Sequence, residues 1–363
     1  MEIKCNVLDR QYQLYKKEYD AAALRVLESG WYILGNEVKQ FEEEFKTHVG
    51  SKYCVGLNSG LDALILAVRA LGIGKGDEVI VQANTYIATV LGITENDATP
   101  IYVEPDEYFN IDASKIEEKI TDKTKAIMVV HLYGQASRMD KIMEIANRHN
   151  LPVIEDCAQS HESCFNGKMT GTFGTIGCFS FYPTKNMGAF GDAGCIVTDN
   201  EEIANRIRMM RNYGSRVKYY NEIEGVNSRL DEMQAALLRV KLTHMDYITN
   251  ERYKLGKRFL EGIHNSKIIL PKTLDGVNHV YHQFVIRCKE RDALQAFLKE
   301  HDIQTQIHYP IPPHLADCYK WQGYKAGDFP ITEEYANTVM SLPLYTGMTE
   351  EEQDYLIEIL NKF

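Results

Sequence analysis

The stretch Val153-Ile-Glu-Asp156-Cys-Ala-Gln159 is a short apolar strand that ends in acidic residues. In an open α/β sheet the carboxyl ends of parallel strands face the ligand crevice, so Asp156 and Gln159 are expected to point into it. The same pattern fits a helix that begins directly after the strand, with Asp156 as its capping acid. Taken alone, the stretch favours this purely structural interpretation.

Similar strands recur on both sides of this stretch, alternating with amphipathic helical segments. Expected strands cover residues 54–57, 78–81, 101–103, 126–130 and 153–154, and expected helices cover 61–71, 87–93 and 139–148. This alternation predicts an α/β fold with a mostly parallel central sheet and helices on both of its faces.

The pattern changes after this region. Strand-like segments around 179–198 are joined by a glycine-rich turn, and a long helical stretch is expected from about 230 to 249. Strands at 279–287 and 303–307 and helices at 292–301 and 350–360 predict a smaller C-terminal α+β domain. We expect a large domain of residues 1–247 and a small domain of residues 248–363.

Composition narrows the function class. With 363 residues and a formal net charge of −11, the chain is enzyme-sized and poorly suited to nucleic acid, which needs a clustered basic surface. The N-terminus lacks the apolar stretch of a signal peptide, and no run approaches the ~18 apolar residues of a spanning helix. The eight cysteines are scattered without a C-x-x-C pair, which is typical of reduced, buried thiols. A cytoplasmic enzyme with no membrane partner is expected.

Two further segments carry candidate chemistry. In Ser180-Phe-Tyr182-Pro-Thr-Lys185-Asn a lysine follows an apolar strand, where loss of water can make its amine a nucleophile, although a lone lysine is more often a surface residue. In Asn58-Ser59-Gly60-Leu a strand passes directly into a helix, whose first N–H groups can bind phosphate. An acid, a lysine and an anion-binding helix start together are what pyridoxal phosphate (PLP) requires.

The chain resembles the DegT/DnrJ/EryC1/StrS family of PLP-dependent sugar-nucleotide aminotransferases, which have the aspartate-aminotransferase fold (fold type I). The resemblance covers nearly the whole chain. It rests on Gly30-Trp-Tyr-Ile-Leu-Gly35, Glu155-Asp156-Cys-Ala-Gln159, Ser180-Phe-Tyr-Pro-Thr-Lys185-Asn and Gly225-Val-Asn227-Ser-Arg229-Leu-Asp-Glu-Met-Gln234.

The resemblance implies roles for the matching residues around the cofactor ring. Lys185 matches the catalytic Schiff-base lysine, Asp156 the acid at the pyridine nitrogen and Gln159 the amide near the phenolic oxygen. Tyr86 falls where the family stacks an aromatic ring on the cofactor.

It also implies contacts to phosphate and substrate. Ser59, Gly60 and Ser180 match phosphate contacts. Asn227 matches an asparagine that reaches the phosphate from the neighbouring subunit, which implies a homodimer with shared sites; in a monomer it would be a loop residue before a helix. The expected substrate contacts are Tyr182, Arg229, His308 and Tyr309.

The resemblance is closest to enzymes that aminate C3 of a dTDP-linked 3-keto-6-deoxyhexose, with glutamate as the amino donor. The product would be a dTDP-3-amino-3,6-dideoxyhexose for surface-polysaccharide or glycoconjugate biosynthesis. The cues are Val130-His131-Leu-Tyr133-Gly134-Gln, Tyr182-Pro-Thr-Lys185 and Gln306-Ile-His308-Tyr309-Pro-Ile-Pro-Pro-His314.

Several alternatives stay open. They are C4 amination, a gluco or galacto substrate, another nucleotide, an amino-acid transaminase or lyase of the same fold that uses arginines such as Arg229 and Arg287, and a PLP-binding regulator without turnover. A sugar dehydratase is disfavoured because such family members carry histidine in place of Lys185. No metal is expected, since His301, His308, His314 and Cys318 do not repeat at ligand spacing.

Overall fold

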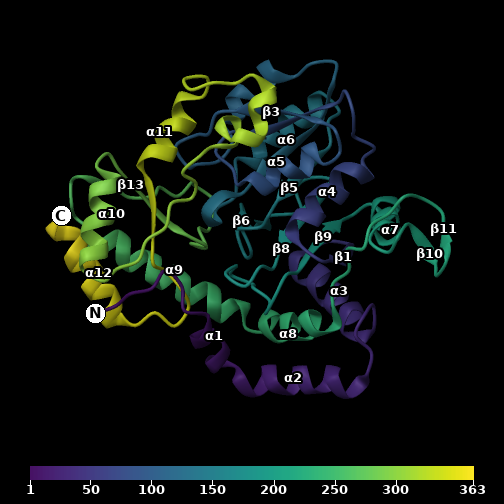
Figure 1. Ribbon diagram of the computed structural model, residues 1–363, viewed down its shortest axis with the longest axis horizontal. Coiled ribbons are helices and arrows are strands. Elements are labelled where there is room, and N and C mark those ends of the chain that lie inside the picture. The colour runs from purple at the N-terminus through teal and green to yellow at the C-terminus, as the bar shows by residue number, and fades with distance from the viewer.

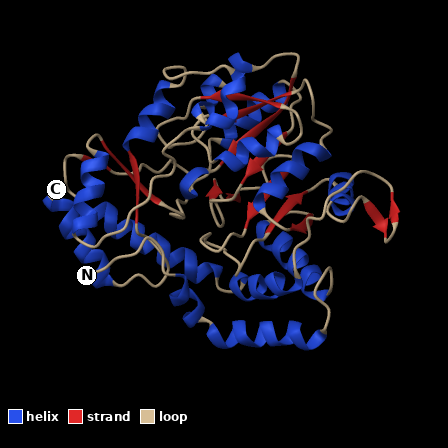
Figure 2. Ribbon diagram, viewed as in Figure 1, coloured by secondary structure: helices blue, strands red, loops and turns tan.

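The core of the molecule is a seven-stranded sheet with the strand order β1-β9-β8-β5-β4-β2-β3. The computed structural model describes all residues 1–363 (Figures 1 and 2). The strands of this sheet are β1 (Tyr53–Leu57), β2 (Glu78–Gln82), β3 (Thr99–Val103), β4 (Thr124–Val130), β5 (Val153–Asp156), β8 (Ile176–Ser180) and β9 (Gly194–Thr198). All neighbouring strands from β3 to β8 are parallel, and only β9 runs antiparallel to its two neighbours. The mostly parallel α/β sheet is therefore confirmed.

Helices cover both faces of this sheet because its strands are apolar on both sides. Ile154 packs on one face among residues of α4 (Gly60–Ala70), α5 (Ile87–Thr94) and α7 (Glu201–Met210). Its neighbour Val153 packs on the opposite face among residues of α6 (Met139–Arg148). The helices α3 (Asn36–Val49) and α8 (Glu232–Leu242) cover the rest of that face.

A smaller C-terminal unit packs beside the sheet. It contains a three-stranded antiparallel sheet and its own apolar core. Its elements are α9 (Met245–Gly262), β12 (Ile268–Ile269), β13 (Phe284–Cys288), α10 (Arg291–Glu300), α11 (Pro330–Thr338), β14 (Val339–Leu342) and α12 (Glu350–Lys362). The remaining α-helices are α1 (Leu8–Leu14) and α2 (Lys16–Ser29), and the remaining strands form the short hairpins β6 (Cys164–Phe165) with β7 (Lys168–Met169) and β10 (Ser215–Val217) with β11 (Tyr220–Asn221).

The N-terminus joins this smaller unit rather than the large sheet. Ile3 pairs with Ile303 and is buried in the C-terminal core. Arg10 forms an ion pair with Glu352 at 2.7 Å. Figure 1 shows both chain ends on this side of the molecule. The division into residues 1–247 and 248–363 stays a proposal, to which we add that the first residues pack on the second unit.

Three expected features differ from the structure. The single helix expected over 230–249 is instead two helices, α8 and α9, separated by a break at His244. The imidazole ring of His244 stacks on the ring of Tyr15 with centroids 3.7 Å apart. Residues 279–283 form a loop before β13, and residues 303–307 make only isolated bridges.

The cysteines and the helix lengths complete the description. All eight thiols are free and five are buried, but Cys5 and Cys164 are half-buried and Cys318 is exposed. None of the helices combines the length and the apolar character that a membrane-spanning segment requires.

Candidate functional site

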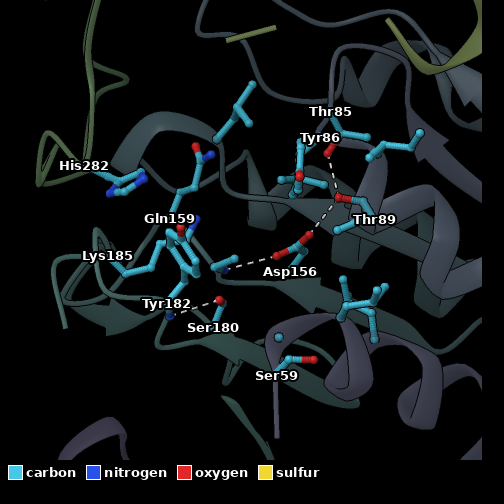
Figure 3. A pocket seen from close by; sticks show the side chains of 18 of the residues that line it. Ser59, Thr85, Tyr86, Thr89, Asp156, Gln159, Ser180, Tyr182, Lys185 and His282 are labelled. Atoms are coloured by element: carbon cyan, nitrogen blue, oxygen red, sulfur yellow. Dashed lines mark hydrogen bonds between the residues drawn. The ribbon is translucent and has the colours of Figure 1, made fainter. Parts of the chain in front are cut away.

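A cavity of about 670 Å³ opens at the carboxyl ends of the central strands (Figure 3). Its wall combines the start of α4, the start of α5, the segments that follow β5 and β8, and two loops of the C-terminal unit. Ten of the predicted site residues line it: Ser59, Gly60, Tyr86, Asp156, Gln159, Ser180, Tyr182, Lys185, His308 and Tyr309. The topology thus brings together residues that lie up to 250 positions apart in the sequence.

Asp156 ends β5 and is almost fully buried. Its Oδ1 accepts the backbone N–H of Ala158 at 3.1 Å, and its Oδ2 accepts the hydroxyl of Thr89 at 2.8 Å. Burial raises the pKa of Asp156, while these hydrogen bonds and the charge of Lys185 act in the opposite direction. The carboxylate is therefore held by directed donors in an apolar environment.

Lys185 lies on the loop that follows β8, and its side chain points into the cavity (Figure 3). Its backbone N–H bonds the carbonyl of Tyr182 at 2.8 Å, which closes a tight turn. Gly188 completes the turn, since a Cβ there would lie 2.2 Å from the carbonyl oxygen of Pro183. Burial lowers the pKa of Lys185 to about 8, and the charge of Asp156 partly opposes this effect. A large fraction of neutral amine near physiological pH follows, as a nucleophilic lysine requires.

The amide of Gln159 has a fixed orientation. Its Oε1 accepts the backbone N–H of Tyr133 at 2.7 Å, so its Nε2 faces the other way and donates to the Tyr309 hydroxyl at 2.9 Å. The ring of Tyr309 lies 5.0 Å from that of Tyr86, centroid to centroid. Two tyrosines and one amide donor thus form one side of the cavity.

The first turn of α4 forms the opposite side. Ser59 caps the helix by accepting the N–H of Asp62 at 3.1 Å, and the helix begins at Gly60. A Cβ on Gly60 would lie 2.4 Å from the Cβ of Ser180, so only glycine allows the helix to approach the end of β8 this closely. Backbone N–H groups, a serine hydroxyl and the positive end of the helix dipole therefore converge, which suits a phosphate.

His308 lies on the wall contributed by the C-terminal unit. Its two ring nitrogens contact Ser341 Oγ at 2.8 Å and Gln283 Nε2 at 3.1 Å. Burial and the charge of Lys185 lower the pKa of His308 to about 4. The ring is therefore neutral at physiological pH and acts as a polar wall rather than a cation.

Two predicted residues do not line this cavity. Asn227 is exposed and pairs with Asn212 in an isolated bridge. Arg229 donates to the Asn212 side chain at 3.3 Å and lies over the ring of Tyr213. Within one chain neither side chain is part of the cavity wall, so the roles predicted for them require a second subunit or a different arrangement.

The sequence reasoning missed several residues that complete the site. Thr89 bonds Asp156, and Thr85 bonds Thr89 at 2.7 Å. His282 lines the cavity, and its Nδ1 lies 3.3 Å from Asn186 Oδ1, next to Lys185. The two threonines are four positions apart, a spacing that places them on one helix face and could have been noticed. No local pattern marks His282, because the loop that carries it reads as part of a strand.

Comparisons with known proteins agree with this geometry. The model of the DegT/DnrJ/EryC1/StrS aminotransferase family matches residues 13–361. The chain is 53% identical over 351 residues to the dTDP-3-amino-3,6-dideoxy-alpha-D-galactopyranose transaminase of Aneurinibacillus thermoaerophilus, with 96% of each chain covered.

Solved structures show the same similarity. The chain superimposes with a TM-score of 0.98 and 43% identity on S. venezuelae DesV in complex with a ketimine intermediate, covering 99% of this chain and 98% of the other. The TM-score is 0.90 and the identity 34% for ntda from Bacillus subtilis with bound cofactor PMP, with coverages of 99% and 84%. The expected aspartate-aminotransferase-like fold is confirmed.

Proposed function

The chain belongs to the DegT/DnrJ/EryC1/StrS aminotransferase family, and from this premise we propose that it transfers an amino group to C3 of a dTDP-linked 3-keto-6-deoxyhexose. The family match, its transaminase relatives and the lysine at position 185 together make it a PLP-dependent transaminase. The observation that carries the proposal is the meeting of Lys185, Asp156 and the first turn of α4 in one cavity.

The residues of the cavity fit PLP. A buried carboxylate, Asp156, has a lone pair to offer a ring nitrogen; a buried amine, Lys185, has a pKa of about 8; and the closely packed start of α4 leaves N–H groups for a phosphate. When bound, PLP supplies an aldehyde that links to amines and a ring that accepts electrons. Ser59, Gly60 and Ser180 would hold its phosphate, Asp156 would face its ring nitrogen, Gln159 its phenolic oxygen and Tyr86 its ring.

The chain's own residues then move protons. The Nζ of Lys185 would carry a proton between substrate and cofactor carbons: as a neutral amine it takes the proton from the donor carbon that carries the amino group, and in the second half-reaction, as the ammonium formed there, it delivers a proton to C3 of the sugar. Asp156 would face the ring nitrogen in both half-reactions. The Tyr86 and Tyr309 side chains line the same cavity as Lys185, with their ring centroids 5.0 Å apart.

The substrate assignment follows the relatives. The similarity to a transaminase of a dTDP-3-amino-3,6-dideoxygalactose supports C3 amination and a galacto product over a gluco product or C4 amination. We propose L-glutamate as the amino donor. We also propose a homodimer, in which Asn227 of one subunit reaches the phosphate site of the other and Arg229 lies near the bound substrate.

One experiment tests the proposal against its rivals. The PLP-loaded protein is incubated with glutamate and a panel of dTDP- and UDP-linked 3-keto and 4-keto sugars, and the products are identified by mass and NMR. We expect a dTDP-3-amino-3,6-dideoxyhexose from the wild type and none from Lys185→Ala. A 4-amino product, transfer only to 2-keto acids, or PLP binding without any turnover would each contradict the proposal, the last in favour of a regulatory protein.

A further inference from the structure

Two threonines at the start of α5 form a short chain of hydrogen bonds that ends at Asp156 (Figure 3). Thr85 lies just before the helix and Thr89 in its first turn, so both hydroxyls face the same side. The Oγ1 atoms of the two threonines are 2.7 Å apart, and Thr89 Oγ1 is 2.8 Å from Asp156 Oδ2. Each threonine has only 1% of its surface exposed.

The direction of this chain follows from proton counting. An ionised carboxylate only accepts hydrogen bonds, so Thr89 must donate its single proton to Asp156. Thr89 Oγ1 then acts as the acceptor for Thr85, which donates. The other carboxylate oxygen, Oδ1, accepts the N–H of Ala158 at 3.1 Å. Each oxygen of Asp156 therefore has one protein donor and keeps a further lone pair for a ligand.

The hydrogen bonds to Asp156 oppose the rise in its pKa that burial causes. Loss of water raises the pKa of Asp156, whereas the Thr89 hydroxyl, the Ala158 N–H and the charges of Lys185 and His131 all lower it. Among these, the hydroxyl of Thr89 is the one contact that a single substitution can remove without changing a charge or the course of β5.

We propose that Thr89, itself held by Thr85, is a positioning residue that fixes the Asp156 carboxylate and keeps it anionic toward the cofactor's ring nitrogen. The inference rests on the proposed function, because it assumes that PLP occupies this cavity. Thr89 itself does not contact the reacting atoms. Thr89 affects the reaction only through its hydrogen bond to Asp156.

The test compares variants that differ by one hydroxyl. Thr89→Val removes the donor with little change in shape, Thr89→Ser restores it, and Thr85→Val removes only the outer hydroxyl. Thr94→Val is the matched control, since Thr94 lies on the same helix and its hydroxyl contacts the Tyr319 hydroxyl at 3.0 Å, away from the cavity. The dissociation constant of PLP for the cofactor-free proteins is measured by absorbance between pH 5.5 and 8.5.

We expect Thr89→Val to bind PLP about tenfold more weakly at pH 7, the low end for loss of a hydrogen bond to a charged group. Without its donor Asp156 gains a proton more readily, so the weakening of binding on acidification should begin at higher pH than in the wild type. Thr85→Val should shift the same way by less, and Thr89→Ser and Thr94→Val should follow the wild type. Loss of stability alone would not move this pH dependence.

Two results of the PLP titration would contradict the role of Thr89. A pH dependence that is unchanged in both Thr89→Val and Thr85→Val, or shifted to lower pH, would overturn the inference. If Thr89→Val does not fold, Thr85→Val decides by the same measurement. A wild-type protein that binds no PLP would instead sink the proposed function, which separates the two failures.

Discussion

The amine of Lys185 should be far more reactive at neutral pH than that of an ordinary lysine. Burial lowers its pKa to about 8, because an apolar environment penalises the ammonium form. An ordinary lysine has a pKa of about 10.4, so at pH 7.5 roughly one such amine in a thousand is neutral, against roughly one in four for Lys185. This difference corresponds to roughly a 200-fold higher fraction of the nucleophile.

Competitive labelling measures this fraction directly. Cofactor-free protein is treated with trace acetic anhydride between pH 6 and 10, and the peptide that contains Lys185 is quantified by mass spectrometry against an added lysine peptide. We expect a midpoint near 8 in the wild type. Asp156→Asn should lower it further, because the Asp156 charge favours the ammonium form. A midpoint near that of the reference peptide, or an upward shift in Asp156→Asn, would refute the electrostatic reasoning.

Substitutions at two positions, Gly60 and Tyr86, test the phosphate and ring contacts. Gly60→Ala should weaken PLP binding at least about tenfold and destabilise the fold by about 1–3 kcal/mol, because the new Cβ would lie 2.4 Å from the Ser180 Cβ. Gly74→Ala is the control, since its new Cβ would meet only Asn96, at 3.5 Å. Equal PLP affinity and melting temperature in the two variants would count against the phosphate assignment. Tyr86→Phe should keep PLP affinity within about threefold of the wild type, whereas Tyr86→Ala should lose about 1 kcal/mol or more of binding free energy because the stacked ring is gone. PLP titration measures both affinities. Identical losses in the two variants would show that the ring does not stack on the cofactor.

The sequence predicted local structure better than contacts between distant segments. Helix α6 spans Met139–Arg148 as expected, because its apolar period and flanking strands leave one solution. The break at His244 was not predicted, and the ring of His244 stacks there on Tyr15, which lies more than 200 residues earlier. Periodicity describes a segment by itself and cannot show such partners.

In the candidate site, too, some residues carry a local sequence signal and others are defined only by contacts with distant segments. Asp156 ends a strand, and Lys185 and Ser59 follow strand ends; this is a local signal in the sequence, and the structure brings the three residues together in the cavity. Thr89 and His282 carry no comparable signal, because their roles arise from neighbours that only the folded chain provides. Asn227 lies outside the cavity of its own chain, and its predicted contact is to the phosphate site of a second subunit.

Lys185 should be the one residue that links to PLP. Borohydride reduction of the PLP-loaded protein, followed by peptide mass spectrometry, tests it most directly. We predict that the PLP-loaded protein is yellow before reduction, and that reduction leaves one pyridoxyl group on the peptide containing Lys185 and no adduct in Lys185→Ala. A protein that stays colourless, or an adduct on another lysine, would contradict the account.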